Sequence, residues 1–333
     1  MNSEKPHKVL VIGCGSIGER HLRCFLSTGR AAVTGCDVNE ELLAQINKNY
    51  NTPVTTDWEL ALQDPTTTAA VVATPANLHV EMATMIMEAG KHVLIEKPLS
   101  VGMEGTEGLI ELRDRQGLVA AVGYVHRSIP TLRSIQSFLG SGEFGDILLL
   151  TITCGQDFAH YRPAYREIYF ADHKKGGGAI QDGITHLINW IEWITGPIET
   201  VYCDAAHQLL EGVEVEDTVN ILARSGKTLI NCSYNLFQAP NEYRVWIHCE
   251  RGSVMGDVQN QKWGTLASGE ENWNWRDANH GERDILFVTQ ANDFLDQIEG
   301  RSTQLSSLEE GIQTLRVNLA SLESSRSGTQ VRI

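Results

Sequence analysis

The sequence lacks any apolar run that approaches the roughly 20 residues of a membrane-spanning helix, so we expect no transmembrane segment. Its first residues, MNSEKPHKVL, contain no signal-peptide core ahead of the first apolar segment, and we therefore expect a cytoplasmic protein. It also lacks a large Lys/Arg cluster, and its formal net charge is −15. Because binding to a phosphate backbone needs a basic face, we do not expect nucleic acid as a partner.

The cysteine pattern does not indicate a metal. The seven cysteines are scattered, odd in number and never spaced as CxxC, at positions 14, 24, 36, 154, 203, 232 and 249. This pattern predicts neither a disulfide framework nor a zinc site, and we expect no bound metal. The remaining composition, with 42% hydrophobic and 21% charged residues in 333, is that of a globular protein long enough for two domains.

The most informative segment is residues 9–18, VLVIGCGSIG, in which an apolar run leads into three glycines. Such a run is typical of a buried parallel strand, and Gly13 permits the tight turn after it. A side chain at Gly15 would block a pyrophosphate from the backbone amides, and Gly18 lets the following helix lie close to the strand. Because a helix N-terminus favours anions, the segment predicts a dinucleotide site. The predicted contacts are Gly13, Gly15, Ser16, Ile17 and Gly18.

An acidic residue closes the next apolar run. Asp37 ends AAVTGCD, 24 positions after Gly13, where a carboxylate can accept hydrogen bonds from both ribose hydroxyls of the adenosine. The same charge would repel a 2′-phosphate, and residues 38–41 contain no Lys or Arg to neutralise it. NAD is therefore favoured over NADP as the cofactor. The alternative is that Asp37 or Asn39 only caps the helix that follows.

The sequence shows two different patterns of secondary structure. Strand and helix patterns alternate from residue 8 to about 124, as in a doubly wound parallel sheet. Later segments alternate apolar and polar residues with a period of two, which predicts antiparallel strands. We therefore expect an α/β Rossmann domain over residues 1–125 and an α+β domain with an open, mostly antiparallel sheet over residues 126–333.

Three helices are expected to cover one face of the second sheet, at residues 179–195, 284–299 and 308–324. Its other face would then be available to substrate or to a second subunit. We expect a homodimer or homotetramer assembled through that sheet.

Polar groups gather where strands of the first domain end, and open α/β sheets bind ligands at those ends. Thr74-Pro75 and Glu96-Lys97-Pro98 each follow an apolar run. In the second domain, GGGAIQDGITHLINWIEWITG carries Asp182 and His186 four residues apart, which is one turn, or about 6 Å, along one face of a helix.

The chain resembles the Gfo/Idh/MocA family of NAD(P)-dependent sugar and cyclitol oxidoreductases. The resemblance is carried, in the family's order, by GCGSIGERH at 13–21, ATPANLH at 73–79, EKP at 96–98, GGGAIQDGITH at 176–186, and FLDQIEG with the later Ser324. It implies a Rossmann domain followed by an open-sheet domain, with a sugar or cyclitol substrate between them. It also implies that Lys97, Asp182 and His186 are the catalytic residues, and that Lys97 precedes a cis proline, Pro98.

The chemistry of alcohol oxidation needs these residue types independently of the resemblance. A hydride leaves for the nicotinamide while the hydroxyl proton goes to a base, and an imidazole with an intrinsic pKa near 6.5 suits that exchange. His186 is the predicted proton-transfer group, Lys97 would stabilise the developing alkoxide, and Asp182 would orient substrate or imidazole. The alternative is a helix-surface pair at Asp182 and His186 beside a solvated Lys97.

Further cofactor contacts follow from the strand-end segments. We expect Thr74, Pro75, Asn77 and His79 to line the nicotinamide or its ribose, although Asn77 could instead cap its helix. Glu96 is expected to bond a cofactor ribose, with a surface role as the alternative, and Lys97 beside it is also expected to contact the cofactor.

Candidate substrate contacts lie in two other segments. Residues 157–175 are locally cationic and aromatic, with Tyr161, Tyr165 and Tyr169 at spacing four, and could stack on a sugar or hold a carboxylate or phosphate. A helix that packs its tyrosines on the sheet would explain the spacing equally well. The substrate contacts expected beside Lys97, Asp182 and His186 are Tyr161, Arg162, Tyr165, His126 and Arg127, the last two with a domain hinge as the alternative.

The expected function is oxidation of a secondary alcohol of a sugar, sugar derivative or cyclitol, or reduction of the matching ketone. One alternative is a glycosidase of the same fold, which keeps NAD bound and would cleave glycosides without net NADH. Another is a non-catalytic sensor of dinucleotide or sugar, against which the presence of Lys97, Asp182 and His186 argues.

Overall fold

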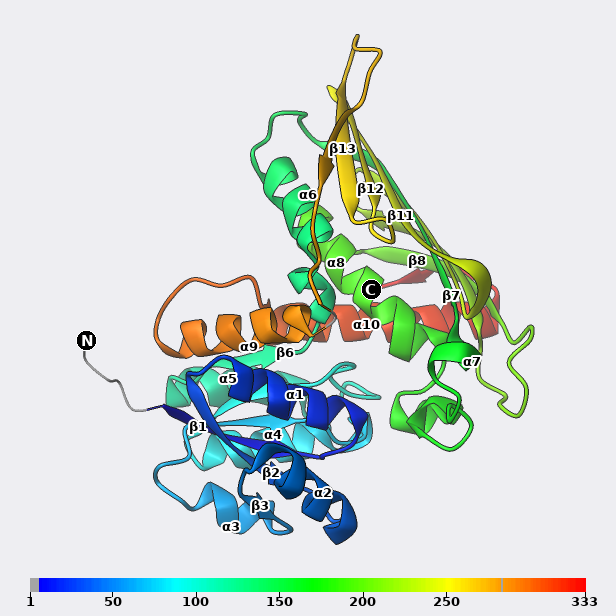
Figure 1. Ribbon diagram of the computed structural model, residues 1–333. Helices are drawn as coiled ribbons and strands as arrows, with labels where there is room; N and C mark the ends of the chain where they lie inside the picture. The colour runs from blue at the N-terminus through cyan, green and yellow to red at the C-terminus, as the bar shows by residue number, and fades with distance from the viewer. Residues whose placement is uncertain (1–5, 283) are drawn as a thin grey trace. The chain divides into compact units, whose positions relative to one another are not determined.

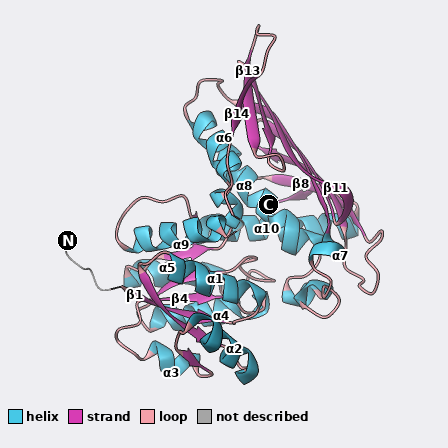
Figure 2. Cartoon of the chain, in the orientation of Figure 1, coloured by secondary structure: helices cyan, strands magenta, loops and turns pink. Residues whose placement is uncertain are grey.

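The computed structural model describes residues 6–282 and 284–333. The chain forms two compact units (Figure 1). Unit 1 runs through Ser128 and takes in Glu282–Ile312 as well, and unit 2 contains Ile129–Gly281 and Gln313–Ile333. Each unit is built on one sheet, drawn in magenta in Figure 2.

Unit 1 contains a seven-stranded sheet in the order β15-β6-β5-β4-β1-β2-β3. Its strands are parallel except for β15, which pairs antiparallel with β6. The central strands are short apolar runs with both faces buried, as expected for a sheet covered by helices on both sides. The strands are β1 (His7–Ile12), β2 (Ala31–Cys36), β3 (Val54–Thr55), β4 (Ala69–Val72), β5 (His92–Ile95), β6 (Ala120–Val122) and β15 (Ser306–Ser307).

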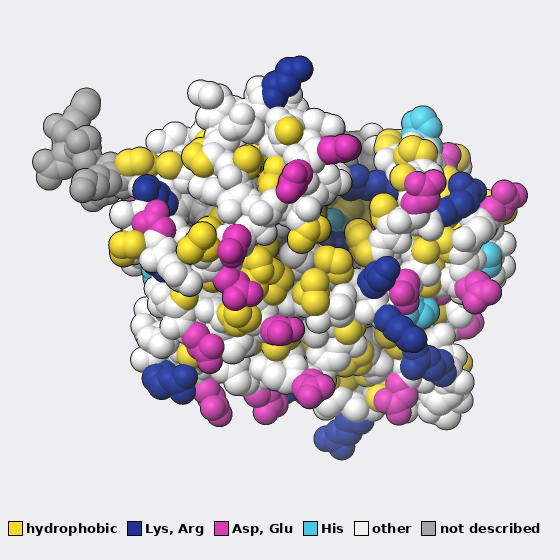
Figure 3. Space-filling model, turned by 90° about the horizontal axis from the view of Figure 1, so that it is seen from below, with side chains coloured by type: hydrophobic (Ala, Val, Ile, Leu, Met, Phe, Trp, Pro, Cys, Tyr) yellow, Lys and Arg dark blue, Asp and Glu magenta, His cyan; other side chains and the backbone are white. Residues whose placement is uncertain are grey.

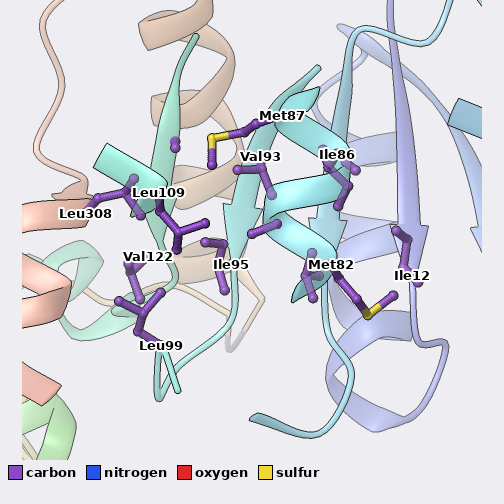
Figure 4. Close-up of a cluster of buried hydrophobic side chains, with 14 of the residues drawn as sticks. Ile12, Met82, Ile86, Met87, Val93, Ile95, Leu99, Leu109, Val122 and Leu308 are labelled. Atoms are coloured by element: carbon purple, nitrogen blue, oxygen red, sulfur yellow. The ribbon is translucent and has the colours of Figure 1, made fainter. Parts of the chain in front are cut away.

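Helices cover both faces of this sheet and form two apolar layers. One layer joins strand side chains to Met82, Ile86 and Leu109 on two helices (Figure 4). The other joins the opposite strand faces to Phe25, Phe294 and neighbouring residues. The helices are α1 (Ser16–Ser27), α2 (Glu40–Tyr50), α3 (Trp58–Leu62), α4 (His79–Glu88), α5 (Thr106–Gln116) and α9 (Ile285–Ile298), with 3₁₀ turns η1 (Ala76–Leu78) and η2 (Val125–Ser128).

The place of α9 corrects the expectation that residues 126–333 form one domain with α9 on the second sheet. Its apolar residues Ala291, Phe294 and Leu295 pack in the core of unit 1, where Phe294 meets Phe25 edge-on at a ring-centroid distance of 6.2 Å. The chain therefore returns to unit 1 after building the second sheet. The reason is that α9 buries its apolar side chains in the same cluster as Leu22 and Phe25 of α1.

Unit 2 contains a nine-stranded, mostly antiparallel sheet in the order β14-β13-β12-β11-β7-β10-β9-β8-β16. Only β7 and β10 pair in parallel. Burial alternates along its strands, so one face is covered and the other is open. The strands are β7 (Ile147–Asp157), β8 (Thr200–Ala206), β9 (Thr218–Ser225), β10 (Thr228–Asn235), β11 (Phe237–Cys249), β12 (Gly252–Asp257), β13 (Lys262–Ala267), β14 (Asn274–Asp277) and β16 (Val331–Arg332).

Helical segments of unit 2 precede and follow its strands. They are α6 (Pro130–Gly140), α7 (Phe158–Tyr161), α8 (Thr185–Thr195) and α10 (Leu308–Ser327), with the 3₁₀ turns η3 (Tyr169–Ala171) and η4 (His173–Lys175) and a π-helical turn, η5 (Ile180–Ile184). Helix α10 begins in unit 1 and continues into unit 2, where buried hydrogen bonds join it to α8: Asn189 to Thr314 and Asn318 to Thr185.

The surface carries mixed charge. Acidic and basic side chains are interspersed on the face drawn in Figure 3, with apolar side chains between them. A helix long and apolar enough to cross a bilayer does not occur among residues 6–282 and 284–333.

Candidate functional site

The glycine turn after β1 has the shape that a pyrophosphate needs. Gly13 has a φ of +87°, and a Cβ there would lie 2.6 Å from the Ala73 carbonyl oxygen. A Cβ on Gly18 would lie 1.6 Å from the Gly13 carbonyl oxygen, so only glycine lets α1 lie this close to β1. By contrast, a Cβ on Gly15 would meet nothing within 4 Å. The start of α1 is therefore open to an approaching phosphate, and the residues present fit a dinucleotide.

Asp37 is tied to that turn. Its Oδ2 accepts a hydrogen bond from the Cys14 amide at 2.7 Å, and its Oδ1 accepts one from the Asn39 amide at 2.9 Å. Asn39, and not Asp37, caps α2, because its side chain accepts from the Leu42 amide. The half-buried Asp37 carboxylate therefore stands beside the turn as a fixed negative charge. Burial and the Asp37 charge raise the pKa of the Cys14 thiol to about 12, so that thiol remains protonated at neutral pH.

His79 lies beneath the strand-end segments instead of on their surface, which corrects the expectation that it lines the cofactor. Its ring is 1% exposed, with Nε2 at 2.8 Å from the Thr74 carbonyl oxygen and Nδ1 at 3.0 Å from that of Pro98. Burial lowers the pKa of His79, although both carbonyls and the Glu96 charge act against that shift. His79 thus joins the segments that follow β4 and β5.

The neighbouring residues of that segment remain candidates for cofactor contacts. Thr74 is half-buried and Pro75 is exposed at the start of η1. Asn77 is exposed within η1, and the N-cap of α4 is Leu78, so Asn77 is not the cap of its helix.

The segment after β5 carries a cis peptide between Lys97 and Pro98, which confirms what the family resemblance implied. Glu96 is 5% exposed, its Oε1 is 2.5 Å from His21 Nε2, and its Oε2 accepts the Lys97 amide at 3.0 Å. Burial acts to raise the pKa of Glu96, but the hydrogen bond and charge of His21 outweigh it and hold the pKa below its usual value. Glu96 therefore forms a buried pair, which corrects its expected bond to a cofactor ribose.

His126 lies near Lys97, as a substrate-site residue would. Both side chains are half-buried. Burial lowers the pKa of His126 to about 3, and the positive charge of Lys97 contributes to the shift. The His126 ring is therefore neutral at physiological pH, which avoids a second cation beside Lys97.

Arg127 does not face a substrate. Its side chain is buried, and Nη1 donates to both carboxylate oxygens of Glu310, at 3.0 and 2.9 Å. Glu310 also accepts the Ser307 amide. Arg127 therefore fixes η2 to the start of α10, which corrects its assignment as a substrate contact.

Asp182 and His186 lie at the start of the helix that the sequence predicted, but that start is not a regular α-helix. A π-helical turn, Ile180–Ile184, carries Asp182, and α8 begins at Thr185. Both side chains are half-buried, while Leu187, Ile188 and Trp190 on α8 are buried in the core. π-Turns of this kind recur at functional sites. The wider turn still leaves residues four apart on one face.

Two tyrosines flank Asp182: Tyr169, which belongs to the aromatic stretch singled out in the sequence, and Tyr234, which the sequence did not assign to the site. The Tyr169 hydroxyl donates to Asp182 Oδ1 at 2.7 Å. A Cβ on Gly183 would lie 2.3 Å from the hydroxyl oxygen of Tyr234, so Gly183 makes room for that buried ring. Burial raises the pKa of Tyr234 well above its usual value, and the Asp182 charge adds to the shift. In the sequence, the glycine at 183 in QDGITH was the signal that could have indicated a closely packed neighbour such as Tyr234.

The glycine run before this turn is held by a buried acid. Glu216 Oε1 accepts the Ile180 amide at 2.8 Å, and its Oε2 is 2.5 Å from His173 Nε2. Gly178 has a φ of +86°, and a Cβ there would lie 2.7 Å from Glu216. The hydrogen bond that His173 donates to Glu216 raises the pKa of His173. These contacts fix the backbone that leads into Asp182.

The tyrosine repeat is not one helix. Tyr165 is 1% exposed, donates to the Glu211 carbonyl at 2.7 Å and packs on Phe158 and Phe170, which corrects its assignment as a substrate contact. Tyr161 is exposed, and its hydroxyl accepts from the Asn241 amide nitrogen at 2.8 Å. Arg162 is half-buried at the end of α7. Tyr161 and Arg162 remain candidates.

Metal chemistry has no support among the residues that the structure describes. No three His, Cys, Asp or Glu side chains in this part of the chain are grouped so that they could hold a metal ion.

Comparisons with known proteins agree with this architecture. A model described as an oxidoreductase family with an NAD-binding Rossmann fold matches residues 7–124, and a GFO/IDH/MocA C-terminal domain model matches residues 132–255. The chain is 28% identical to levoglucosan dehydrogenase of Pseudarthrobacter phenanthrenivorans over 166 residues, which are 50% of this chain and 43% of that protein. It is 27% identical to inositol 2-dehydrogenase of Pseudomonas savastanoi pv. phaseolicola over 241 residues, 68% of each chain.

A solved structure, levoglucosan dehydrogenase in complex with NADH and levoglucosan, has the same fold, with a TM-score of 0.89 at 21% identity over 99% of this chain and 100% of that one. The alignment with the curated levoglucosan dehydrogenase nevertheless spans less than half of that protein's length. The expected fold class, an α/β Rossmann domain followed by a mostly antiparallel sheet domain, is confirmed. On the two family matches and this architecture, the chain belongs to the GFO/IDH/MocA family of oxidoreductases with an NAD-binding Rossmann fold.

Proposed function

We propose that this protein is an NAD-dependent oxidoreductase that transfers a hydride between nicotinamide and a secondary alcohol or ketone of a sugar, sugar derivative or cyclitol. The observation that carries the proposal is the position of Lys97. It follows β5 on a cis peptide, and β5, β4 and β1 are neighbouring parallel strands, so Lys97 and the glycine turn lie at the same edge of one sheet. A dinucleotide on that turn would place its reactive ring toward this edge.

Asp37 supports NAD over NADP. Its carboxylate is fixed beside the turn by two backbone amides, and Glu40 and Glu41 add negative charge in the first turn of α2. A 2′-phosphate there would meet only like charge among residues 37–41.

Each polar residue has a definite role in this proposal. Bound NAD would supply the hydride acceptor. His186 takes the hydroxyl proton, Lys97 stabilises the oxygen as negative charge develops on it, and Asp182 orients the substrate hydroxyl or the imidazole. The neutral His126 ring leaves Lys97 as the cation beside it. Tyr161 and Arg162 are proposed to contact more distant parts of the substrate.

The test is a panel of inositols, aldoses, uronates and nucleotide sugars, each assayed with NAD and with NADP for formation of the reduced cofactor. We expect turnover of at least one sugar or cyclitol with NAD, and a much lower kcat/KM with NADP. Glycoside cleavage without net NADH would instead indicate the glycosidase. Tight dinucleotide binding without turnover of any panel member would indicate the sensor.

Tyr169→Phe should lower kcat/KM about 5- to 30-fold, because the substitution removes the hydroxyl that donates a hydrogen bond to Asp182. The matched control is Tyr50→Phe, which removes a tyrosine hydroxyl that donates to another carboxylate, Glu19, at 2.7 Å. Steady-state kinetics of both variants check the prediction. Equal losses in the two variants, or none in either, would show that the Tyr169 hydroxyl does not support Asp182.

We also propose that the open face of the unit 2 sheet joins two copies of the chain. Strand register places one row of residues across that face, in the order Tyr202, Leu222, Asn231, Thr151, Trp246, Met255, Gly264 and Trp275. Tyr202, Leu222 and Trp275 are 39%, 57% and 43% exposed. Exposed apolar side chains on an open sheet face are typical of a protein interface.

Leu222→Glu should convert the oligomer to a monomer, because it places a charge at the most exposed apolar side chain of this row. The control is Leu60→Glu, an equally exposed leucine (61%) on α3 of unit 1. Light scattering coupled to size exclusion measures the mass of each. The interface is wrongly placed if the Leu222 variant keeps the mass of the unaltered protein.

A further inference from the structure

The backbone of Lys97 is fixed by a chain of buried polar groups that begins on α1. His21 Nε2 lies 2.5 Å from Glu96 Oε1, and Glu96 Oε2 accepts the Lys97 amide at 3.0 Å. His21 is 1% exposed and Glu96 is 5% exposed. One carboxylate oxygen of Glu96 thus contacts a side chain of α1, and the other accepts from the backbone of the predicted catalytic lysine.

The surroundings leave this carboxylate little freedom. A Cβ on Gly123 would lie 3.0 Å from Glu96 Oε1, so glycine at 123 makes the room that the carboxylate occupies. The His21 ring packs edge-on against Phe287, with ring centroids 5.5 Å apart, and also lies near Phe25. A buried carboxylate needs such partners, because an unpaired charge in the interior is strongly disfavoured.

The position of His21 links these contacts to the proposed phosphate site. His21 lies five residues after Ser16, the first residue of α1, which is about 8 Å along the helix. The open start of the same helix is the proposed phosphate site. One rigid element therefore reaches both the dinucleotide and, through Glu96, the lysine.

We propose that His21 is a positioning residue for Lys97: it holds the Glu96 carboxylate, which holds the Lys97 amide, so that α1 sets the place of the lysine relative to the bound dinucleotide. This proposal rests on the proposed function for the role of Lys97. The contacts themselves can be tested without cofactor or substrate.

The first test measures hydrogen exchange of the Lys97 amide in protein labelled with ¹⁵N-lysine, with the signal assigned from Lys97→Arg. His21→Leu keeps the bulk that packs on Phe287 and removes the donor, whereas His21→Gln keeps a nitrogen donor at the Nε2 position. We expect exchange to be about tenfold faster or more in His21→Leu and close to the unaltered rate in His21→Gln. If His21→Leu does not fold, His21→Asn serves, since its side chain is too short to reach Glu96.

The second test is kinetic. His21→Leu should lower kcat about 10- to 100-fold with the Kd for NAD changed less than about threefold, and His21→Gln should recover most of kcat. Equal amide exchange in the Leu and Gln variants would overturn the proposal, as would an unchanged kcat in an active His21→Leu enzyme. If the unaltered protein turns over no sugar, the proposed function is contradicted instead. The exchange result would still decide whether His21 holds the backbone of Lys97.

Discussion

Lys97→Met and His186→Ala should each lower kcat about 10³-fold or more while the protein still binds NAD. Methionine keeps most of the length of the lysine and removes the charge that stabilises the developing alkoxide, and alanine removes the group that takes the proton. Neither change touches the glycine turn or Asp37, so the Kd for NAD should change by less than about threefold. Steady-state kinetics and NADH fluorescence titration measure the two quantities.

Matched controls separate these roles from general effects of charge or of imidazole loss. Lys174→Met removes an exposed cation from η4, and His160→Ala removes an exposed ring from α7. Both controls should keep kcat within about twofold, as surface substitutions usually do. A Lys97→Met or His186→Ala enzyme with nearly full kcat would remove that residue from the mechanism.

Gly18→Ala should destabilise the protein, whereas Gly15→Ala should weaken NAD binding. A Cβ at Gly18 would lie 1.6 Å from the Gly13 carbonyl oxygen, so the backbone must move, and we expect a loss of about 3 kcal/mol or more in the free energy of unfolding. A Cβ at Gly15 meets nothing within 4 Å, and its φ of −62° suits alanine, so the free protein should keep its stability. The added methyl instead stands where a phosphate must approach, so NAD affinity should fall about tenfold or more.

Thermal unfolding without ligand and calorimetric titration with NAD measure both variants. The decisive result is Gly15→Ala. Unchanged NAD affinity in a stable Gly15→Ala protein would mean that the pyrophosphate does not lie on the start of α1, and the cofactor site would have to be sought elsewhere.

The features that the sequence predicted well are local. A strand, a turn with Gly13 and Gly18, and a helix lie within about 20 residues, and their steric demands are nearly independent of the rest of the chain. The apolar pattern of a strand is local in the same sense, because it reflects only which faces of that strand are buried. Both the parallel and the antiparallel sheet were therefore predicted. The family resemblance was confirmed because its motifs spread over both units.

Two of the predictions that the structure corrected depended on partners far away in the sequence. Arg127 was expected at a substrate, but its partner Glu310 lies 183 positions later in the chain. Glu96 was expected at the cofactor, but a histidine 75 positions earlier takes its carboxylate into the interior. A polar residue beside a motif can serve the ligand or support the residue that does. Only burial and hydrogen-bond partners distinguish these two cases, and neither can be read from spacing.

The start of the helix carrying Asp182 and His186 shows a different limit. The spacing of four correctly places both residues at one helix start, but it predicts neither the π-helical turn that carries Asp182 nor the hydrogen bond from Tyr169. Tyrosines four residues apart suggested a single helical face. Tyr165 is instead in the core, Tyr161 is at the surface, and Tyr169 bonds to Asp182.

The central claim is that Lys97 and His186 act on the same substrate oxygen in the presence of NAD. A crystal structure of the protein with NAD and a sugar that it turns over tests this claim most directly. We predict that Lys97 Nζ and one ring nitrogen of His186 each lie within about 3.2 Å of the same substrate oxygen. A bound, reactive sugar whose oxidised hydroxyl touches neither side chain would contradict the account.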